Sequence, residues 1–215
     1  MSSEFLDRIE DQIRVSLFTD NDLKLIFRDK PVSAIYNSLA YHLKKKNVER
    51  YRRGLYSLSR KNKIKNHFSK FKLANKLVLH SFISFESALS YHGLIPEAVY
   101  EITSACLVKN KLFKNSLGQF SFTYSPVTPF YLGVEKDKIS EAKIANPIRA
   151  LFDLIYSRRK IYKTIFQLVD DFRIDQVELN KFLKNYKKSE ILDLAELYNK
   201  KSTKNLAQIL IKELG

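Results

Sequence analysis

The residues best suited to do chemistry in this chain are the basic side chains between positions 44 and 72. Twelve lysines and arginines fall in these 29 residues, against a single acid, Glu49. This local excess of eleven positive charges is most of the formal net charge of +15 carried by the 215-residue chain. Such a concentrated charge is typical of a protein that binds a polyanion, because lysine and arginine donate charge-assisted hydrogen bonds to phosphate oxygens. We expect nucleic acid as the polyanion, and a solvated lysine-rich surface is the alternative.

Part of this charge lies on a short predicted hairpin, NVERYRRGLYSL, residues 47–58. Its two extended halves are joined by an Arg-Arg-Gly turn in which Gly54 can supply a positive φ angle. We expect Leu55 and Tyr56 to attach the hairpin to the core. The side chains predicted to contact phosphates are Lys45, Lys46, Arg50, Arg52 and Arg53.

Three helical segments precede the hairpin. Apolar residues spaced four apart predict the first helix over residues 4–17. Thr19 is a suitable N-cap for a second helix that runs to about Phe27. Ser33 is the predicted N-cap of a third helix that ends near Asn47. Three helices followed by a basic hairpin is the order of a winged helix-turn-helix, whose third helix enters the major groove of DNA.

The third predicted helix has two distinct faces at 100° per residue. Ile35, Leu39 and Leu43 form an apolar stripe, and His42 falls on the same side, so we interpret it as a packed histidine and not as a ligand. The opposite face is polar. We predict that its residues Ser33, Asn37, Tyr41 and Lys44 read base edges. Asn37 is the first choice, because an amide can bind adenine through two hydrogen bonds.

The rest of the sequence predicts a mixed α/β domain. Residues 59–80 are interpreted as a basic linker that becomes helical over 68–79, and its lysines are either phosphate contacts or a solvated spacer. From residue 81, a short helix precedes a strand-like run over 99–108 and a hairpin around Gly118. Asn146-Pro147 opens another helix, and further amphipathic helices follow, expected to pack on the small sheet.

The predicted fold class is therefore α+β. The N-terminal winged helix-turn-helix, residues 1–58, is followed by the basic linker, residues 59–80. An α+β domain with a small antiparallel sheet and a helical C-terminal tail covers residues 81–215.

Enzymatic chemistry finds little support in the sequence. Neither the four histidines nor Cys106 reach metal-ligand spacing, and nucleotide-binding and nucleophile-elbow motifs are not found. A metal-dependent nuclease is the enzymatic alternative, because it would use carboxylates that converge on Mg²⁺. The available carboxylates are Glu86, Glu101, Glu135 and Asp153, and none is followed two residues later by a lysine. We expect no catalytic activity and no cofactor.

The composition also bears on the cellular compartment. A single cysteine excludes an internal disulfide, and the first thirty residues contain no signal-peptide h-region. No apolar run approaches the roughly 18 residues of a membrane span. We expect a soluble cytoplasmic protein that has no membrane partner.

Several segments, in the same order, resemble the AbiEi-like antitoxins of type IV toxin–antitoxin systems, which act in abortive phage infection. They are ISFESALSYHGLIPEAVYEIT, LGQFSFTY, IANPIRALFDLIY and the N-terminal segment whose hairpin reads Arg-Arg-Gly-x-Tyr. In the third segment the family usually has Thr/Ser-Pro-Glu-Lys-Ala-Leu-x-Asp. Pro147, Ala150, Leu151 and Asp153 match that run, whereas Asn146, Ile148 and Arg149 depart from it.

The resemblance implies a transcriptional repressor that binds inverted repeats in its own promoter as double-stranded DNA. It also implies an antitoxin that counteracts a nucleotidyltransferase toxin, with contacts between repressor copies on DNA and no catalytic activity. It assigns no role to Glu86, His92 or Asp153. The alternative is a module that binds RNA or the toxin without operator specificity.

Overall fold

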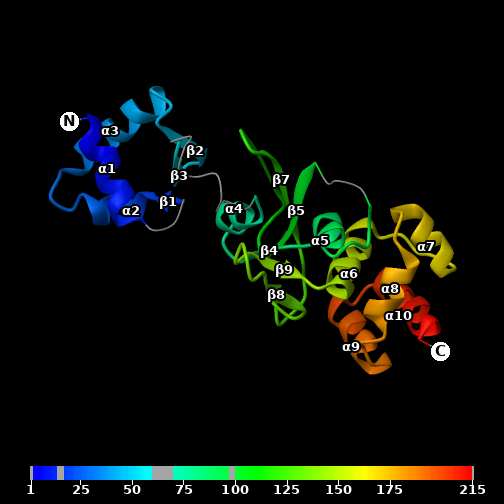
Figure 1. The fold of residues 1–215 in the computed structure, drawn as a ribbon. Helices are drawn as coiled ribbons and strands as arrows, with labels where there is room; N and C mark the ends of the chain where they lie inside the picture. Colours follow the sequence, from blue (N-terminus) through cyan, green and yellow to red (C-terminus); the bar gives the residue numbers. More distant parts are fainter. Residues whose placement is uncertain (1, 14–16, 60–69, 97–99, 215) are drawn as a thin grey trace.

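The computed structural model describes residues 2–13, 17–59, 70–96 and 100–214, and these form a mixed α+β fold (Figure 1). The described residues contain ten helices and two sheets, one of three strands and one of six. The predicted α+β class is confirmed at this level. Most of the predicted basic linker, residues 60–69, lies outside the described residues.

The first part of the chain combines three helices with a three-stranded antiparallel sheet of order β1-β3-β2. Its elements are α1 (Ser2–Gln12), β1 (Phe18–Thr19), α2 (Asp20–Ile26), α3 (Val32–Lys44), β2 (Val48–Arg52) and β3 (Leu55–Leu58). Strands β2 and β3 form the predicted hairpin, with Gly54 at φ 77° in the turn. A side chain at that angle would be strained, so the glycine permits the tight turn.

Local hydrogen bonds explain where the second helix begins. The Thr19 side chain accepts a bond from the backbone N–H of Asp22, and the Asp22 carboxylate accepts the backbone N–H of Thr19 at 2.7 Å. This capping box confirms the predicted start of α2.

Three other predicted helix ends are wrong. Helix α1 ends at Gln12, so Leu17 is not part of its apolar stripe. Helix α3 begins at Val32, because Pro31, with its fixed φ of −58°, stands at the N-cap position. Ser33 therefore lies in the first turn and is not the cap. At the other end, Lys46 and not Asn47 takes the left-handed conformation, with φ 58°.

The second part of the chain contains a six-stranded sheet of order β6-β7-β5-β4-β9-β8. Its strands are β4 (Ser81–Ile83), β5 (Glu101–Cys106), β6 (Lys111–Asn115), β7 (Gly118–Tyr124), β8 (Val134–Lys136) and β9 (Lys143–Ala145). The prediction of a small antiparallel sheet is wrong, because β5 pairs with β7, and β4 with β9, in parallel. The β6–β7 hairpin folds back so that β7 inserts beside β5, and this makes two strands of the same direction neighbours.

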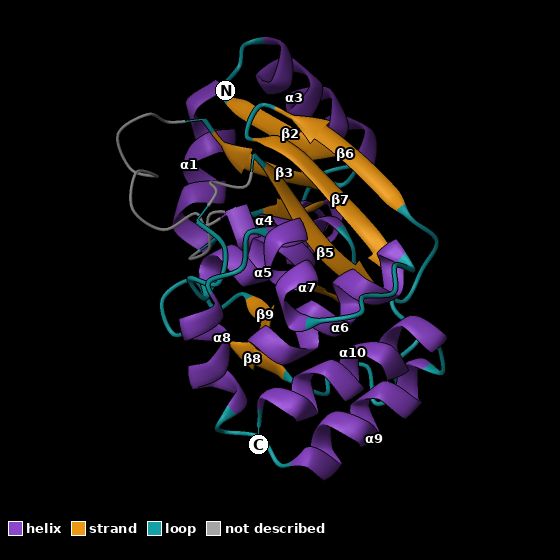
Figure 2. Cartoon of the chain, turned by 90° about the vertical axis from the view of Figure 1, so that its right-hand side faces the viewer, coloured by secondary structure: helices purple, strands orange, loops and turns teal. Residues whose placement is uncertain are grey.

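Seven helices accompany this sheet (Figure 2). They are α4 (Lys70–Leu77), α5 (Phe85–Tyr91), α6 (Pro147–Arg158), α7 (Ile165–Phe172), α8 (Gln176–Leu183), α9 (Lys188–Tyr198) and α10 (Lys201–Glu213). Asn146 caps α6 by accepting the backbone N–H of Arg149, with Pro147 in the first turn, as predicted.

Helix α6 lies between the sheet and the C-terminal helices in both views (Figures 1 and 2). Every residue from Pro147 to Ile155 is buried, so this helix needs cover on all sides. Helices α8 and α10 contact α6, and α9 packs on α10. The prediction that the tail helices pack on the sheet is therefore wrong, because α6 occupies that place.

The β2–β3 hairpin contributes side chains to two separate buried clusters. Val48 and Tyr56 pack with α1, α2 and α3 in the first cluster. Tyr51 and Leu55, together with Leu17, pack in the second cluster, which contains α4 and the six-stranded sheet. Neighbouring strand residues point to opposite faces, so one hairpin can join both cores.

Candidate nucleic-acid interface

The two predicted faces of α3 are present in the structure. Ile35, Leu39 and His42 are buried, as expected for the core stripe. The four residues predicted to read base edges, Ser33, Asn37, Tyr41 and Lys44, are all exposed along the opposite face. The backbone thus presents this polar face to solvent because the apolar stripe is fixed against α1 and the hairpin.

His42 is packed beneath the exposed face, and the prediction of a packed histidine is confirmed. Its ring stacks on Phe5 with centroids 5.1 Å apart, and Tyr41 packs edge-on against it. Its Nδ1 lies 3.2 Å from Nδ2 of Asn47, and since an amide nitrogen only donates, Nδ1 is the acceptor. Burial lowers the pKa of His42, so the neutral ring is favoured in the folded protein.

The arginines of the hairpin differ in exposure. Arg50 and Arg53 are exposed, whereas Arg52 is half-buried. The Arg52 guanidinium donates from Nη1 to the carbonyl of Arg53 at 3.0 Å and from Nη2 to the carbonyl of Lys76 in α4 at 3.4 Å. Arg52 therefore also connects the hairpin to the second part of the chain, which its predicted phosphate role did not include.

A groove of about 840 Å³ separates α3 from the hairpin, and three of the predicted phosphate-contact residues line it. It is lined by Asp20, Tyr36, Leu39, Ala40, Leu43, Arg50, Arg52, Arg53 and Tyr56. Three arginines outweigh the single carboxylate of Asp20, so the groove is positive overall. None of the four predicted base-reading residues lines the groove. At 100° per residue they follow Ala40 around α3, on the side away from the apolar stripe.

The lysines that follow α3 are exposed as well. Lys45 and Lys46 lie at the end of the helix nearest the hairpin, and the Lys45 ammonium stands 6.0 Å from the centre of the Tyr41 ring. Cations at a helix C-terminus are favoured by the helix dipole. All nine predicted contact residues are thus at least partly accessible on α3 and the hairpin.

Two groove residues were missed by the sequence reasoning, Tyr36 and Asp20. By helical period, Tyr36 lies at the edge of the apolar stripe of α3. This position could have predicted that its side chain lines a groove beside the helix. Asp20 carries an oxygen, Oδ1, that is buried and unpaired among the described residues. Only the folded hairpin, whose Gly54 approaches the Asp20 carboxylate, brings it there.

The carboxylates considered for metal chemistry are dispersed. Glu86 pairs with Arg158 at 2.9 Å, and Asp153 is buried beside Arg149. Within the part of the chain that the structure describes, no group of three or more His, Cys, Asp or Glu side chains could hold a metal ion. His92 is half-buried and donates from Nε2 to the carbonyl of Ala145 at 2.9 Å, and burial lowers its pKa.

Asp153 instead accepts hydrogen bonds from four side chains. Ser84 and Arg149 donate to Oδ2, at 2.7 and 3.2 Å. Ser125 and Tyr198 donate to Oδ1, at 2.8 and 2.7 Å. The sequence reasoning gave no role to Arg149, although its spacing of four residues from Asp153 on a helix is a recognisable ion-pair signal.

Comparison of the chain with protein-family models and with curated proteins finds no match. Among the described helices, none combines the length and the apolar character that crossing a membrane requires.

Proposed function

We propose that this protein is a sequence-specific DNA-binding transcriptional repressor whose N-terminal part acts as a winged helix-turn-helix. The observation that supports this proposal most is the position of the exposed polar face of α3 beside a groove lined by Arg50, Arg52 and Arg53. An exposed polar helix can enter the major groove, while arginines on an adjacent hairpin contact the DNA backbone.

The division of labour follows from the side-chain chemistry. The donors and acceptors that can distinguish base pairs by their major-groove edges are carried by Ser33, Asn37, Tyr41 and Lys44. The basic residues Lys45, Lys46, Arg50, Arg52 and Arg53 fix the register by contacts to phosphates and carry no sequence information of their own. Exposed arginines suit this role, because a bidentate guanidinium matches the geometry of a phosphate group.

The proposal includes the role of antitoxin in a type IV system, on the strength of the AbiEi-like segments in the sequence. In this role the protein binds inverted repeats in its own promoter and counteracts a nucleotidyltransferase toxin, directly or through shared targets. Two copies would meet on the repeats, because a two-fold DNA site is matched by two protein copies. Such a repressor acts in the cytoplasm, carries no cofactor and catalyses no reaction.

The test is fluorescence anisotropy of the full chain on its own upstream DNA, on a scrambled duplex and on a structured RNA, across a salt series. We expect tight binding to the native duplex alone near physiological salt. Equal and steeply salt-dependent binding to both duplexes would mean that the basic residues bind DNA only through non-specific electrostatic attraction. Preference for the RNA would favour an RNA-binding module, and cleavage of DNA that depends on added Mg²⁺ would favour a nuclease.

A further inference from the structure

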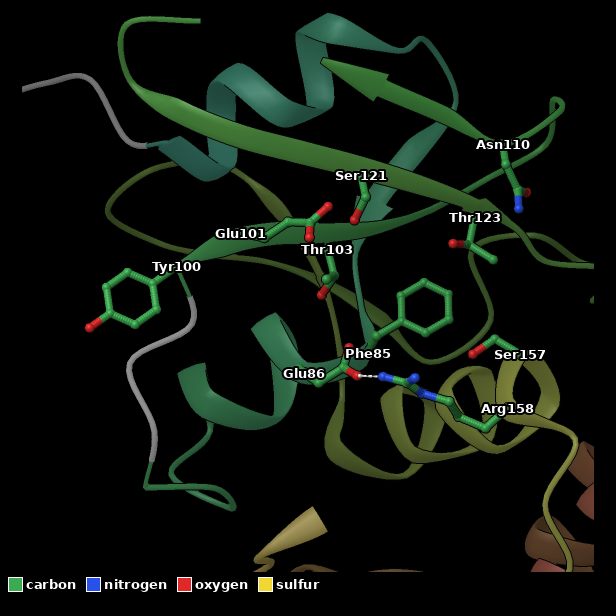
Figure 3. A pocket seen from close by; sticks show the side chains of 10 residues that line it. All are labelled: Phe85, Glu86, Tyr100, Glu101, Thr103, Asn110, Ser121, Thr123, Ser157 and Arg158. Carbon is green, nitrogen blue, oxygen red and sulfur yellow. Dashed lines mark hydrogen bonds and ion pairs between the residues drawn. The ribbon is translucent and has the colours of Figure 1, made fainter. Parts of the chain in front are cut away.

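A cavity of about 610 Å³ lies in the second part of the chain (Figure 3), and none of its lining residues belongs to α3 or to the β2–β3 hairpin. One wall is the face of strands β5 and β7, and the other is made by the start of α5 and the end of α6. Its lining residues are Phe85, Glu86, Tyr100, Glu101, Thr103, Asn110, Ser121, Thr123, Ser157 and Arg158. The volume falls in the range of sites for small molecules.

The lining is rich in hydrogen-bond acceptors and carries negative charge. Two carboxylates, from Glu86 and Glu101, face one guanidinium, from Arg158, which leaves a net charge of −1. The chain as a whole carries a net charge of +15. The cavity is therefore a local region of opposite formal charge on a strongly basic protein, and this favours a cationic ligand over a phosphate or a carboxylate.

The two carboxylates are not equivalent. Glu86 has a counter-ion, because Arg158 Nη2 lies 2.9 Å from its Oε1 (Figure 3). Glu101 is half-buried and its carboxylate points toward Ser121 and Thr103 (Figure 3). Within the described part of the chain, the Glu101 carboxylate forms no hydrogen bond and no ion pair. A partly desolvated carboxylate is stabilised by a cation that donates hydrogen bonds to it, so this side chain points to a positively charged ligand.

The backbone beneath the cavity is held in a strained conformation. Phe85, a lining residue, has a φ of 54°, in the left-handed region that a bulky side chain rarely adopts. Hydrogen bonds on both sides maintain it, because Thr103 Oγ1 donates to the carbonyl of Ser84 at 2.8 Å and accepts the backbone N–H of Ser87 at 3.0 Å. Strain that the surroundings maintain in this way is found most often at binding sites and active sites.

From these observations we infer that the cavity binds a small organic cation whose guanidinium or ammonium group pairs with Glu101. The hydroxyl groups of Ser121 and Thr123 accept further hydrogen bonds from the ligand, and the amide of Asn110 lies at the same end (Figure 3). Arg158 lies on the opposite wall, where its guanidinium pairs with Glu86 at 2.9 Å. This inference does not depend on DNA binding.

The experiment is calorimetric titration of the full chain with agmatine, which carries both a guanidinium and an ammonium group. Glutarate and 1,5-pentanediol serve as anionic and neutral probes of similar length. We expect saturable binding of agmatine alone. Glu101→Gln should weaken it at least about tenfold, the loss of one charge-assisted pair. The matched control is Glu135→Gln, an exposed carboxylate on β8 outside the cavity, which should bind as the wild type does.

A second measurement keeps the test independent of the variants. Addition of agmatine to the wild-type protein should shift the backbone NMR signals of Ser121 and Thr123 and leave those of α3 in place. The inference is overturned if agmatine shows no saturation up to about 10 mM, a concentration that still detects very weak binding. Equal binding by Glu101→Gln, equal binding of the neutral probe, or signal changes remote from β5 and β7 would overturn it as well.

Discussion

The Nε of Arg149 lies 3.2 Å from Oδ2 of Asp153, one turn later on α6, and both side chains are buried. The guanidinium also lies 5.0 Å from the centre of the Phe82 ring and 5.7 Å from that of Tyr198. Its Nη1 donates to the carbonyl of Leu132 at 2.8 Å. The pair therefore joins α6 to the sheet and to α9 through interactions that are shielded from water.

Asp153→Ala should destabilise the protein by about 3–5 kcal/mol, because it leaves a buried guanidinium without its counter-charge. Urea unfolding followed by circular dichroism measures this change. The control is Glu178→Gln, which removes one side of the exposed Glu178–Lys181 pair and should leave the unfolding midpoint nearly unchanged. Equal effects of the two variants would contradict the assignment of Asp153 as a structural centre of this core.

Arg53→Ala should weaken the binding of all duplexes about equally. Loss of one phosphate contact should reduce the slope of log K against log salt concentration by about 0.9. Anisotropy titrations at several salt concentrations measure the slope. Arg53 is a cleaner choice than Arg52, whose side chain also holds the carbonyl of Lys76 in α4. If the slope of Arg53→Ala matched that of the wild type, the proposed phosphate contact would be wrong.

Asn37→Ala should act differently, because the side chain is proposed to read a base edge. We expect a loss of about 1–3 kcal/mol on the native duplex, with relaxed discrimination at one base pair and little change in salt slope. Competition among duplexes that carry every single-base substitution measures this. Ser38→Ala, a half-buried neighbour outside the proposed contact set, is the control. Unaltered specificity of Asn37→Ala would falsify the placement of α3 in the major groove.

Leu55→Ala should destabilise the protein by about 2–5 kcal/mol and weaken DNA binding. Leu55 is buried in the cluster that contains α4 and the six-stranded sheet, although it belongs to the hairpin. Its loss removes part of the contact that fixes the hairpin orientation. Leu25→Ala, whose side chain is 73% exposed on α2, should change the free energy of unfolding by no more than about 0.5 kcal/mol. Chemical denaturation of both variants measures the free energy of unfolding, and anisotropy titration measures their binding to DNA.

Stability should fall below neutral pH through His42 and His92. Burial lowers the pKa of both rings, so the unfolded chain binds protons that the folded chain does not. Their contribution is complete above the unfolded histidine pKa of about 6.5 and is lost as the pH falls through their lower folded values. Histidine NMR titration and urea unfolding from pH 8 to 5 measure this. Folded pKa values at or above 6.5 for both rings would contradict it.

The sequence by itself determined the features that depend on a few neighbouring residues. Thr19 and Asp22 form a capping box within one turn, and Asn146-Pro147 opens α6 through bonds to the next residues. Gly54 allows the hairpin turn, and the period of the apolar residues set the two faces of α3. Such features follow from local hydrogen bonds and side-chain period, so they can be read before the fold is known.

Only the tertiary structure decided how distant segments meet. The parallel pairing of β5 with β7 and the placement of α6 under the C-terminal helices follow from which arrangement buries the most apolar surface, and sequence period leaves this open. Arg149 reads as a surface residue until Asp153 and the rings around it are in place. The cavity brings Glu86, Glu101 and Arg158 together from three elements. Contacts over such separations are set by the packing of the whole core, and no local pattern encodes them.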